Sequence, residues 1–165
     1  MTTNKIIGAL VSTQNQVDQL SRAGLHASGG TWTNSVAQAV NTAGTVLTFD
    51  SEIRNSGITV DATNKIFTMN TGGMFMFCLS WNFAVAAGHG LYLQVNGVRT
   101  NIFVGQNTTT TYHSGIIMKY LQKNHEVSFV MVSGVNTNVA VVAEDGVAES
   151  PILQIAQVSP KFTGS

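Results

Sequence analysis

The clearest pattern in the chain is an alternation of large apolar side chains between residues 74 and 83. Because successive side chains of a β-strand point to opposite faces, this spacing predicts a strand with one face in a core. The predicted core face carries Phe75, Phe77, Leu79, Trp81 and Phe83. The opposite face carries Met74, Met76, Cys78, Ser80 and Asn82. Its first half is apolar, so we expect a second layer or a neighbouring subunit to cover it.

Shorter runs rich in Val, Ile and Thr follow one another from about residue 31 onward, with turn signals between them. The pair Asn96-Gly97 separates two such runs and predicts a two-residue hairpin turn, because both residues tolerate a positive φ. Further strands are expected at 46–49, 57–60, 66–69, 91–95, 98–104, 112–120, 127–131, 139–143 and 152–158. The pattern therefore predicts an all-β fold, a jelly-roll β-sandwich of about 8–10 antiparallel strands.

The first thirty residues follow a different pattern. Their apolar residues have the four-three spacing of a coiled-coil seam, and the predicted attachment residues are Ile6, Leu10, Val17 and Leu20. Two heptads are too short for a stable isolated helix, so we predict a short helical or extended arm that packs on a partner. Residues 26–30 read as a flexible joint. We thus divide the chain into an arm and linker at 1–30 and a head at 31–165. The alternative is that the first residues form a flexible tail that lies against the head of the same chain.

Composition narrows the classes of partner. Charged residues make up 10% of the 165 positions and the net charge is zero, against about 25% charged residues in ordinary domains. With no Lys/Arg cluster to attract phosphates, nucleic acid and anionic membranes are not expected as partners. The sequence starts without the basic and then apolar segments of a secretion signal, so we expect synthesis in a reducing compartment. A neutral surface rich in Thr and Asn suits contact with other protein.

Known catalytic motifs are missing from the sequence. It contains no Gly-rich phosphate loop, no G-x-S-x-G and no H-E-x-x-H, and its four histidines lie far apart. Cys78 lies in an apolar strand, a context that favours a small hydrophobic role over a nucleophilic one. We therefore expect neither an enzyme nor a cofactor. Carboxylates at 50–52, 61 and 144–145 leave a structural calcium ion open as an alternative.

Several motifs together resemble the globular head shared by tumour necrosis factor and the complement first-component family. They are the strand VLTFD at 46–50, the turn at 55–57, the series Asp61, Phe67, Gly73, Phe75 and Phe77, the Asn96-Gly97 hairpin, the segment 123–127 and the last strand from 150. The similarity spans residues 31 to 159. It departs from the family where His125-Glu126 replaces Gly-Asp and where the last strand lacks a glycine.

This resemblance implies a homotrimer built around a three-fold axis through the sheet face that looks away from each core. On this basis the predicted trimer interface comprises Met74, Met76, Cys78, Leu153 and Ile155. A jelly roll with a short arm, made in a reducing cytoplasm, also resembles the decoration proteins of bacterial viruses.

Two functional hypotheses follow. The first is a non-enzymatic trimeric virion protein, a phage capsid decoration (cement) protein or short-fibre knob, assembled in the host cytoplasm, that binds the particle through its arm and bridges capsid subunits. The alternative is a trimeric head that recognises a cell-surface receptor or glycan through outer loops containing His89, Asn107 and Tyr112.

Overall fold

The computed structural model describes residues 28–83, 88–104, 112–140, 143–144, 147–148 and 151–160. All regular structure in these ranges is β, which confirms the predicted all-β fold. No helix in the described ranges has the length and apolarity needed to cross a bilayer. The strands are β1 (Gly29–Thr33), β2 (Gln38–Val40), β3 (Thr45–Val46), β4 (Ser51–Ser56), β5 (Ile58–Val60), β6 (Phe67–Met69), β7 (Gly73–Phe83), β8 (His89–Val95), β9 (Val98–Val104), β10 (Tyr112–Leu121), β11 (Glu126–Ser133), β12 (Thr137–Ala140), β13 (Ala143–Glu144), β14 (Val147–Ala148) and β15 (Ile152–Pro160).

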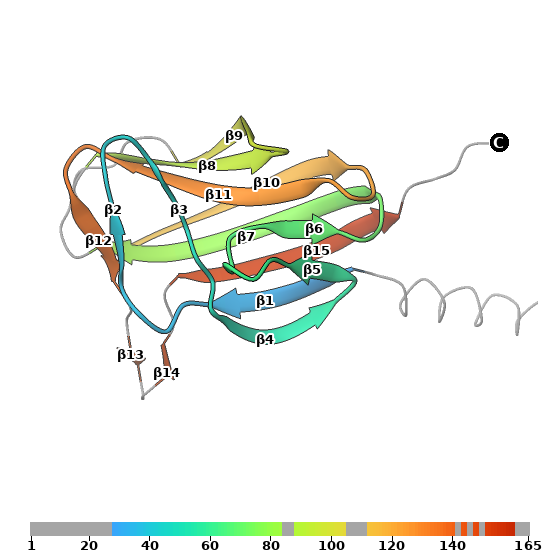
Figure 1. The fold of residues 1–165 in the computed structure, drawn as a ribbon, viewed down its shortest axis with the longest axis horizontal. Coiled ribbons are helices and arrows are strands. Elements are labelled where there is room, and N and C mark those ends of the chain that lie inside the picture. The colour runs from blue at the N-terminus through green and yellow to red at the C-terminus, as the bar shows by residue number, and fades with distance from the viewer. Residues whose placement is uncertain are drawn as a thin grey trace, which may run out of the picture.

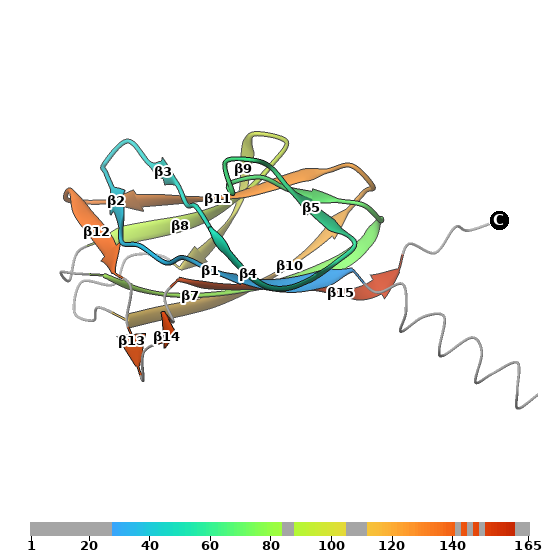
Figure 2. The same cartoon turned by 60° about the horizontal axis from the view of Figure 1, so that its bottom comes forward.

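The strands form two sheets that pack face to face (Figures 1 and 2). The first sheet has seven strands in the order β2-β12-β7-β15-β1-β4, with β10 paired to the other edge of β7. The second has six strands in the order β5-β6-β11-β8-β9, with β3 paired to β11, and β13 and β14 pair separately. The pairings within both sheets are antiparallel. This arrangement is the predicted jelly-roll sandwich.

The core between the sheets is built from aromatic rings. Phe67 lies at its centre, with ring centroids 4.9 Å from Trp32, 5.8 Å from Phe49 and 5.9 Å from Phe129, all in edge-to-face geometry. Such contacts add to the free energy gained by burying apolar area. The predicted core face of β7 is confirmed from Phe75 to Trp81, where each inward side chain is fully buried.

The hairpin between β8 and β9 also matches its prediction. Asn96 and Gly97 have φ values of 50° and 78°, the left-handed conformation that a two-residue turn of this type requires. The register continues through the turn, with Val95 opposite Val98.

Three strands of the first sheet were not predicted. Gly29 and Gly30, assigned above to a flexible joint, are instead the first residues of β1, where a Cβ on Gly29 would lie 2.7 Å from the carbonyl oxygen of Ile155. Close approach of a neighbouring strand explains these glycines better than flexibility does. The strand β4 is exposed at every position, so its sequence has no alternation to detect, and β2 has only three residues, too few to show a pattern.

Candidate assembly interface

The outer face of the first sheet carries apolar side chains over three neighbouring strands. Met118 of β10 lies opposite Met76 of β7, which lies opposite Ala156 of β15. We call this surface the outer apolar face. It comprises Ile116, Met118 and Tyr120 of β10, Met74, Met76 and Cys78 of β7, and Ile152 and Ala156 of β15.

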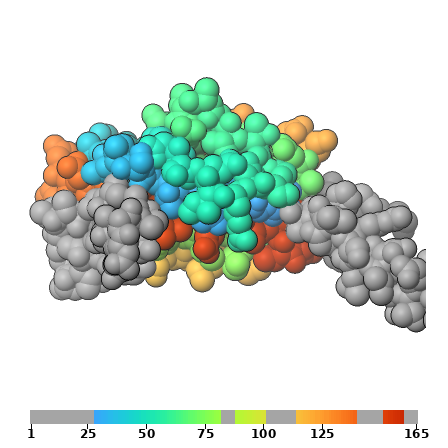
Figure 3. Space-filling view, turned by 90° about the horizontal axis from the view of Figure 1, so that it is seen from below, coloured from blue at the N-terminus to red at the C-terminus, as the bar shows by residue number. Residues whose placement is uncertain are grey.

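The side chains of β10 protrude furthest from this face. Ile116, Met118 and Tyr120 are 66%, 57% and 48% exposed, whereas the three residues of β7 are half-buried between the flanking strands. Seen from the β4 side, atoms of β10 and β7 reach the lower margin of the molecule (Figure 3). None of the side chains described at outer positions of these three strands is charged. An uncharged apolar patch with this much exposed area is typical of a protein–protein interface.

A hollow of about 260 Å³ opens within the outer apolar face. Its lining includes Cys78, Ser80, Ser114, Gly115 and Ile152. Burial raises the pKa of the Cys78 thiol, so the thiol stays protonated near neutral pH, in keeping with the small hydrophobic role predicted for it.

The prediction for the last strand has the wrong face. Leu153 and Ile155 are 0% and 2% exposed and belong to the core of their own chain. The register places them opposite Leu79 and Phe77, two core residues of β7. The outward positions of β15 are therefore Ile152, Gln154 and Ala156. Both alternating sets of this strand contain apolar residues, so its sequence alone does not decide which set faces the core.

The contribution of β10 was missed. The alternation of Ile116, Met118 and Tyr120 in the sequence predicts the strand at 112–120, but the predicted interface does not include these three residues. The signal is similar to that in β7: Ile117 and Leu121, which flank Lys119 on the other face of β10, are buried in the structure, so this strand carries large apolar side chains on both faces.

His89 is not a loop residue. It begins β8, is 3% exposed and lies edge to face with Trp81, with ring centroids 6.0 Å apart. A recognition role for its side chain is thus wrong. Tyr112 is the first residue of β10, and Asn107 and the arm residues Ile6, Leu10, Val17 and Leu20 lie outside the described residues.

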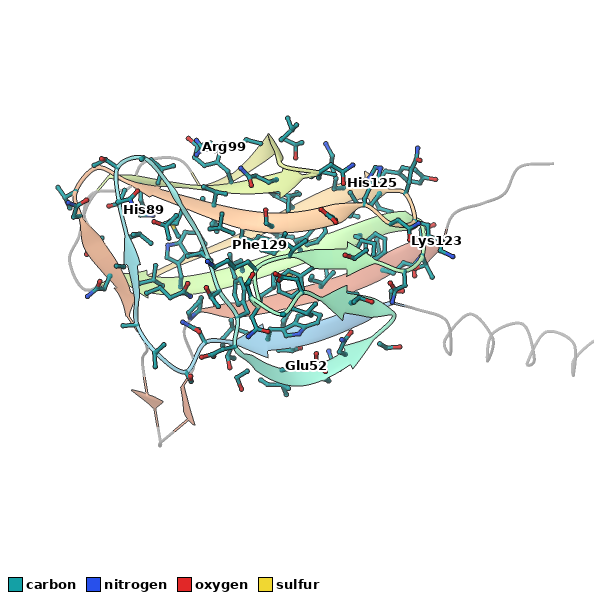
Figure 4. All side chains as sticks on the ribbon, in the orientation of Figure 1. Glu52, His89, Arg99, Lys123, His125 and Phe129 are labelled. Atoms are coloured by element: carbon teal, nitrogen blue, oxygen red, sulfur yellow. The ribbon has the colours of Figure 1, made fainter. Side chains whose placement is uncertain are left out.

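A hydrogen-bond network fixes the point where the head begins. The side-chain oxygen of Gln157 accepts hydrogen bonds from the backbone N–H of Ser28 and the hydroxyl of Thr71, each at 3.1 Å, and its amide nitrogen donates to the carbonyl of Gly72 at 2.9 Å. Because β1 and β15 are antiparallel, the start of β1 and the end of β15 lie at one end of the head, which we call the base. His125 and Lys123 lie at the base and His89 near the other end (Figure 4).

The carboxylates of Asp50, Glu52 and Asp61 accept hydrogen bonds within the head. Asp50 accepts hydrogen bonds from the N–H and hydroxyl of Ser35 at 2.7 and 2.6 Å, and Glu52 accepts one from the indole of Trp32 at 3.3 Å. Asp61 accepts hydrogen bonds from the backbone of Thr63, Lys65 and Ile66. Within the described ranges, no three His, Cys, Asp or Glu side chains gather in a way that could hold a metal ion.

Comparison with known proteins identifies the fold. No family model matches the sequence, and no curated protein matches it. Among solved structures, murine APRIL at pH 5.0 is similar with a TM-score of 0.56 and 10% identity, over 80% of this chain and 99% of that one. The globular domain of the zebrafish complement 1qA protein is similar with a TM-score of 0.50 and 15% identity, over 79% and 92% of the two chains. The chain therefore has the fold of the tumour necrosis factor and complement heads.

Proposed function

We propose that this protein is a non-enzymatic homotrimeric head that decorates and cements a phage capsid or forms the knob of a short fibre. The observation that carries the proposal is the outer apolar face, on which Ile116, Met118 and Tyr120 stay about half exposed or more in the single chain. The fold supports trimerisation through this face, as the resemblance to the tumour necrosis factor and complement heads implies.

Burial of the outer apolar face would contribute favourable free energy to association. Complete burial of one large apolar side chain is worth about 1.5–3 kcal/mol, and joining two proteins costs about 4–15 kcal/mol of translational and rotational freedom. The three side chains of β10 are already partly buried in the single chain, so burying the rest of them together with the partly exposed ones of β7 contributes several kcal/mol per subunit, which is comparable to the lower end of this cost. Because no charge has to be desolvated at the described outer positions, little of this gain is lost.

The base is the side from which such a head would attach. The Gln157 network holds Ser28 in place, so the segment before it leaves from a fixed point. In a capsid-bound trimer, the arm residues Ile6, Leu10, Val17 and Leu20 would hold the particle and the head would bridge neighbouring capsid subunits. The virion, assembled in the host cytoplasm, is the location that follows from this role.

The solution mass tests the interface. We expect the full chain to sediment at three times its 17.5 kDa mass. Met118→Glu would bury an unpaired charge in the interface and should produce a folded monomer. Val98→Glu is the matched control, because Val98 is 65% exposed but lies on β9 of the other sheet; this variant should remain trimeric. A monomeric wild-type chain at micromolar concentration would contradict the proposal.

Particle binding tests the attachment role. A chain lacking residues 1–25 should remain trimeric and lose binding to virus particles, measured by co-sedimentation. If the shortened chain binds particles as well as the full chain, the arm is not the attachment segment. Binding of the full trimer to a glycan array, without any binding to particles, would favour the receptor or glycan recognition head.

A further inference from the structure

On the outer face of the first sheet, the side chains project by different amounts along one row of residues that are paired across adjacent strands. The row runs from Met118 through Met76, Ala156 and Gly29 to Ser56, each residue lying opposite the next on the adjacent strand. Side-chain size falls from two methionines to an alanine and then to a glycine. The surface therefore descends from β10 towards β1 over three strand spacings, about 14 Å.

The low part of this row is a trough of about 340 Å³. Gly29 forms its floor, with Ser56 and Arg54 of β4 on one side and Ala156 and Gln157 of β15 on the other. Arg54 is held over β1 by a 3.3 Å hydrogen bond from its Nε to the hydroxyl of Thr31. We call this surface the glycine trough.

The high part of the row is a ridge formed by Ile116, Met118 and Tyr120. Among the described strands, β10 pairs with β7 alone, so the ridge stands at a free edge of the first sheet. The glycine trough continues into the outer apolar face, because Ala156 belongs to both. A single copy cannot fill its own trough with its own ridge, since β7 and β15 lie rigidly between them.

We infer that the glycine trough is the receptor for the β10 ridge of a second copy of this chain. This inference rests on the proposed function, since it names the part of the neighbouring copy that contacts each part of the interface. A stepped surface is complementary to another copy of itself when the high edge of one meets the low edge of the other. Ridge against ridge would leave the trough empty and lose the packing contacts of its lining.

The trough also suits an uncharged occupant. Arg54 is its one charged lining residue, and its guanidinium is engaged by Thr31. The ridge brings a phenol and two aliphatic chains, and the aliphatic stem of Arg54 can pack against them while its charge remains in water. A closed pair or a closed ring both satisfy this contact, and the ring of three is the form that the proposed function requires.

Paired cysteines test the contact directly. In a Cys78→Ser background, Ser56→Cys combined with Met118→Cys should give covalent trimers with a short thiol–thiol cross-linker, whereas each single cysteine should give none. Ser51→Cys with Met118→Cys is the matched control, because Ser51 is an exposed residue of the same strand that lies opposite Thr33, outside the trough. This pair should cross-link poorly. The mass of each variant is measured before cross-linking.

The outcomes separate the two proposals. Trimeric protein in which Met118→Cys cross-links to itself, or in which Ser51 and Ser56 react equally, overturns the ridge-in-trough contact and leaves the trimer standing. A cross-linked product that ends at a dimer supports the contact and contradicts the trimer. Monomeric protein overturns both.

Filling the trough provides a second readout. Ser56→Trp should occupy the space that the neighbouring ridge needs and weaken association about ten-fold, the consequence of an overpacked contact. Ser51→Trp adds the same side chain outside the trough and should leave the dissociation constant unchanged. Equal dissociation constants for the two variants would overturn the inference.

Discussion

The outer faces of the two sheets differ in how far the chain itself covers their apolar side chains. On the second sheet the chain covers its own apolar residues: a Cβ on Gly44 would lie 3.2 Å from Cγ1 of Val130, and Val130 is buried although it looks away from the core. Next to it, the guanidinium of Arg99 lies 5.2 Å from the ring centre of Tyr92. On the first sheet, no described segment covers Ile116 or Met118. Within the described residues, the outer face of the second sheet is partly covered by the chain itself, whereas that of the first sheet stays exposed, and we propose that a second copy covers it.

The largest expected effect contrasts two neighbours on β7. Phe77 points into the core and Met76 into the outer apolar face. In a Met118→Glu background, where association does not contribute to stability, Phe77→Ala should lower the free energy of unfolding by about 3–5 kcal/mol because it leaves a cavity. Met76→Ala should lower it far less, yet weaken association of the otherwise wild-type chain. Denaturant titration and sedimentation measure the two quantities, and equal losses of unfolding free energy would mean that the two faces of β7 do not differ as described.

A smaller loss of stability is expected when the hydrogen-bond network at the base is removed. Gln157→Ala removes an acceptor for Ser28 and Thr71 and a donor for Gly72. The Thr71 hydroxyl keeps its 2.7 Å hydrogen bond with the hydroxyl of Ser28, but the N–H of Ser28 and the carbonyl of Gly72 lose this partner, which costs about 1–3 kcal/mol and should be visible as a lower denaturation midpoint. Gln154→Ala on the same strand is the control, since Gln154 is exposed; both variants are compared in the Met118→Glu background, where association does not contribute to the midpoint. An unchanged midpoint for Gln157→Ala would show that the network does not hold the base.

A substitution on the outer face of the second sheet should lower the stability of the fold by a smaller amount still. Arg99→Ala removes the cation–π contact with Tyr92, which is worth about 0.5–1 kcal/mol at an exposed site. Thermal unfolding should show a slight decrease in stability, and the solution mass should not change. A change of mass would mean that the outer face of the second sheet also takes part in assembly.

The smallest effect concerns pH. Burial raises the pKa of Asp61, but hydrogen bonds from Thr63, Ile66 and Lys65 outweigh it and lower the pKa from its ordinary 3.8 to about 2. A carboxylate with a depressed pKa stabilises the fold fully above the unfolded value, and this contribution is lost as pH falls from 3.8 towards 2.

Asp61→Asn should therefore flatten the acid limb of the stability profile in this window and leave its slope above pH 5 unchanged, as measured by unfolding at a series of pH values. A profile identical to that of the wild type would contradict this assignment.

Where alternation is strong, the sequence was enough to predict the structure. The strand β7 with its buried residues Phe75 to Trp81 and the turn at Asn96-Gly97 follow from local patterns that packing does not change. The outward position of Met74, Met76 and Cys78 followed in the same way. The prediction failed where a strand has no contrast between its faces, as in β4, or too much apolar content on both, as at Leu153 and Ile155. Only the register with β7, a long-range property, decides the second case.

The burial of His89 could not be predicted from the sequence for a related reason. A histidine between two glycines favours a loop, whereas the long-range pairing with Ser133 of β11 places His89 in a strand and the contact with Trp81 buries its side chain. The glycine trough was hidden too, because Gly29 and Gly30 carry the same signal as a flexible joint until the positions of their neighbours on β15 and β4 are known.

The antiparallel pairing of β1 with β15 has a consequence for the strength of attachment. Since every copy starts its head at the base, the arms of three joined copies would all emerge towards the same side. A single weak contact per arm would then suffice, because the second and third contacts form at the millimolar effective concentrations typical of short tethers. Avidity of this kind would let a small protein with a net charge of zero hold firmly to a repetitive lattice while binding isolated lattice subunits only briefly.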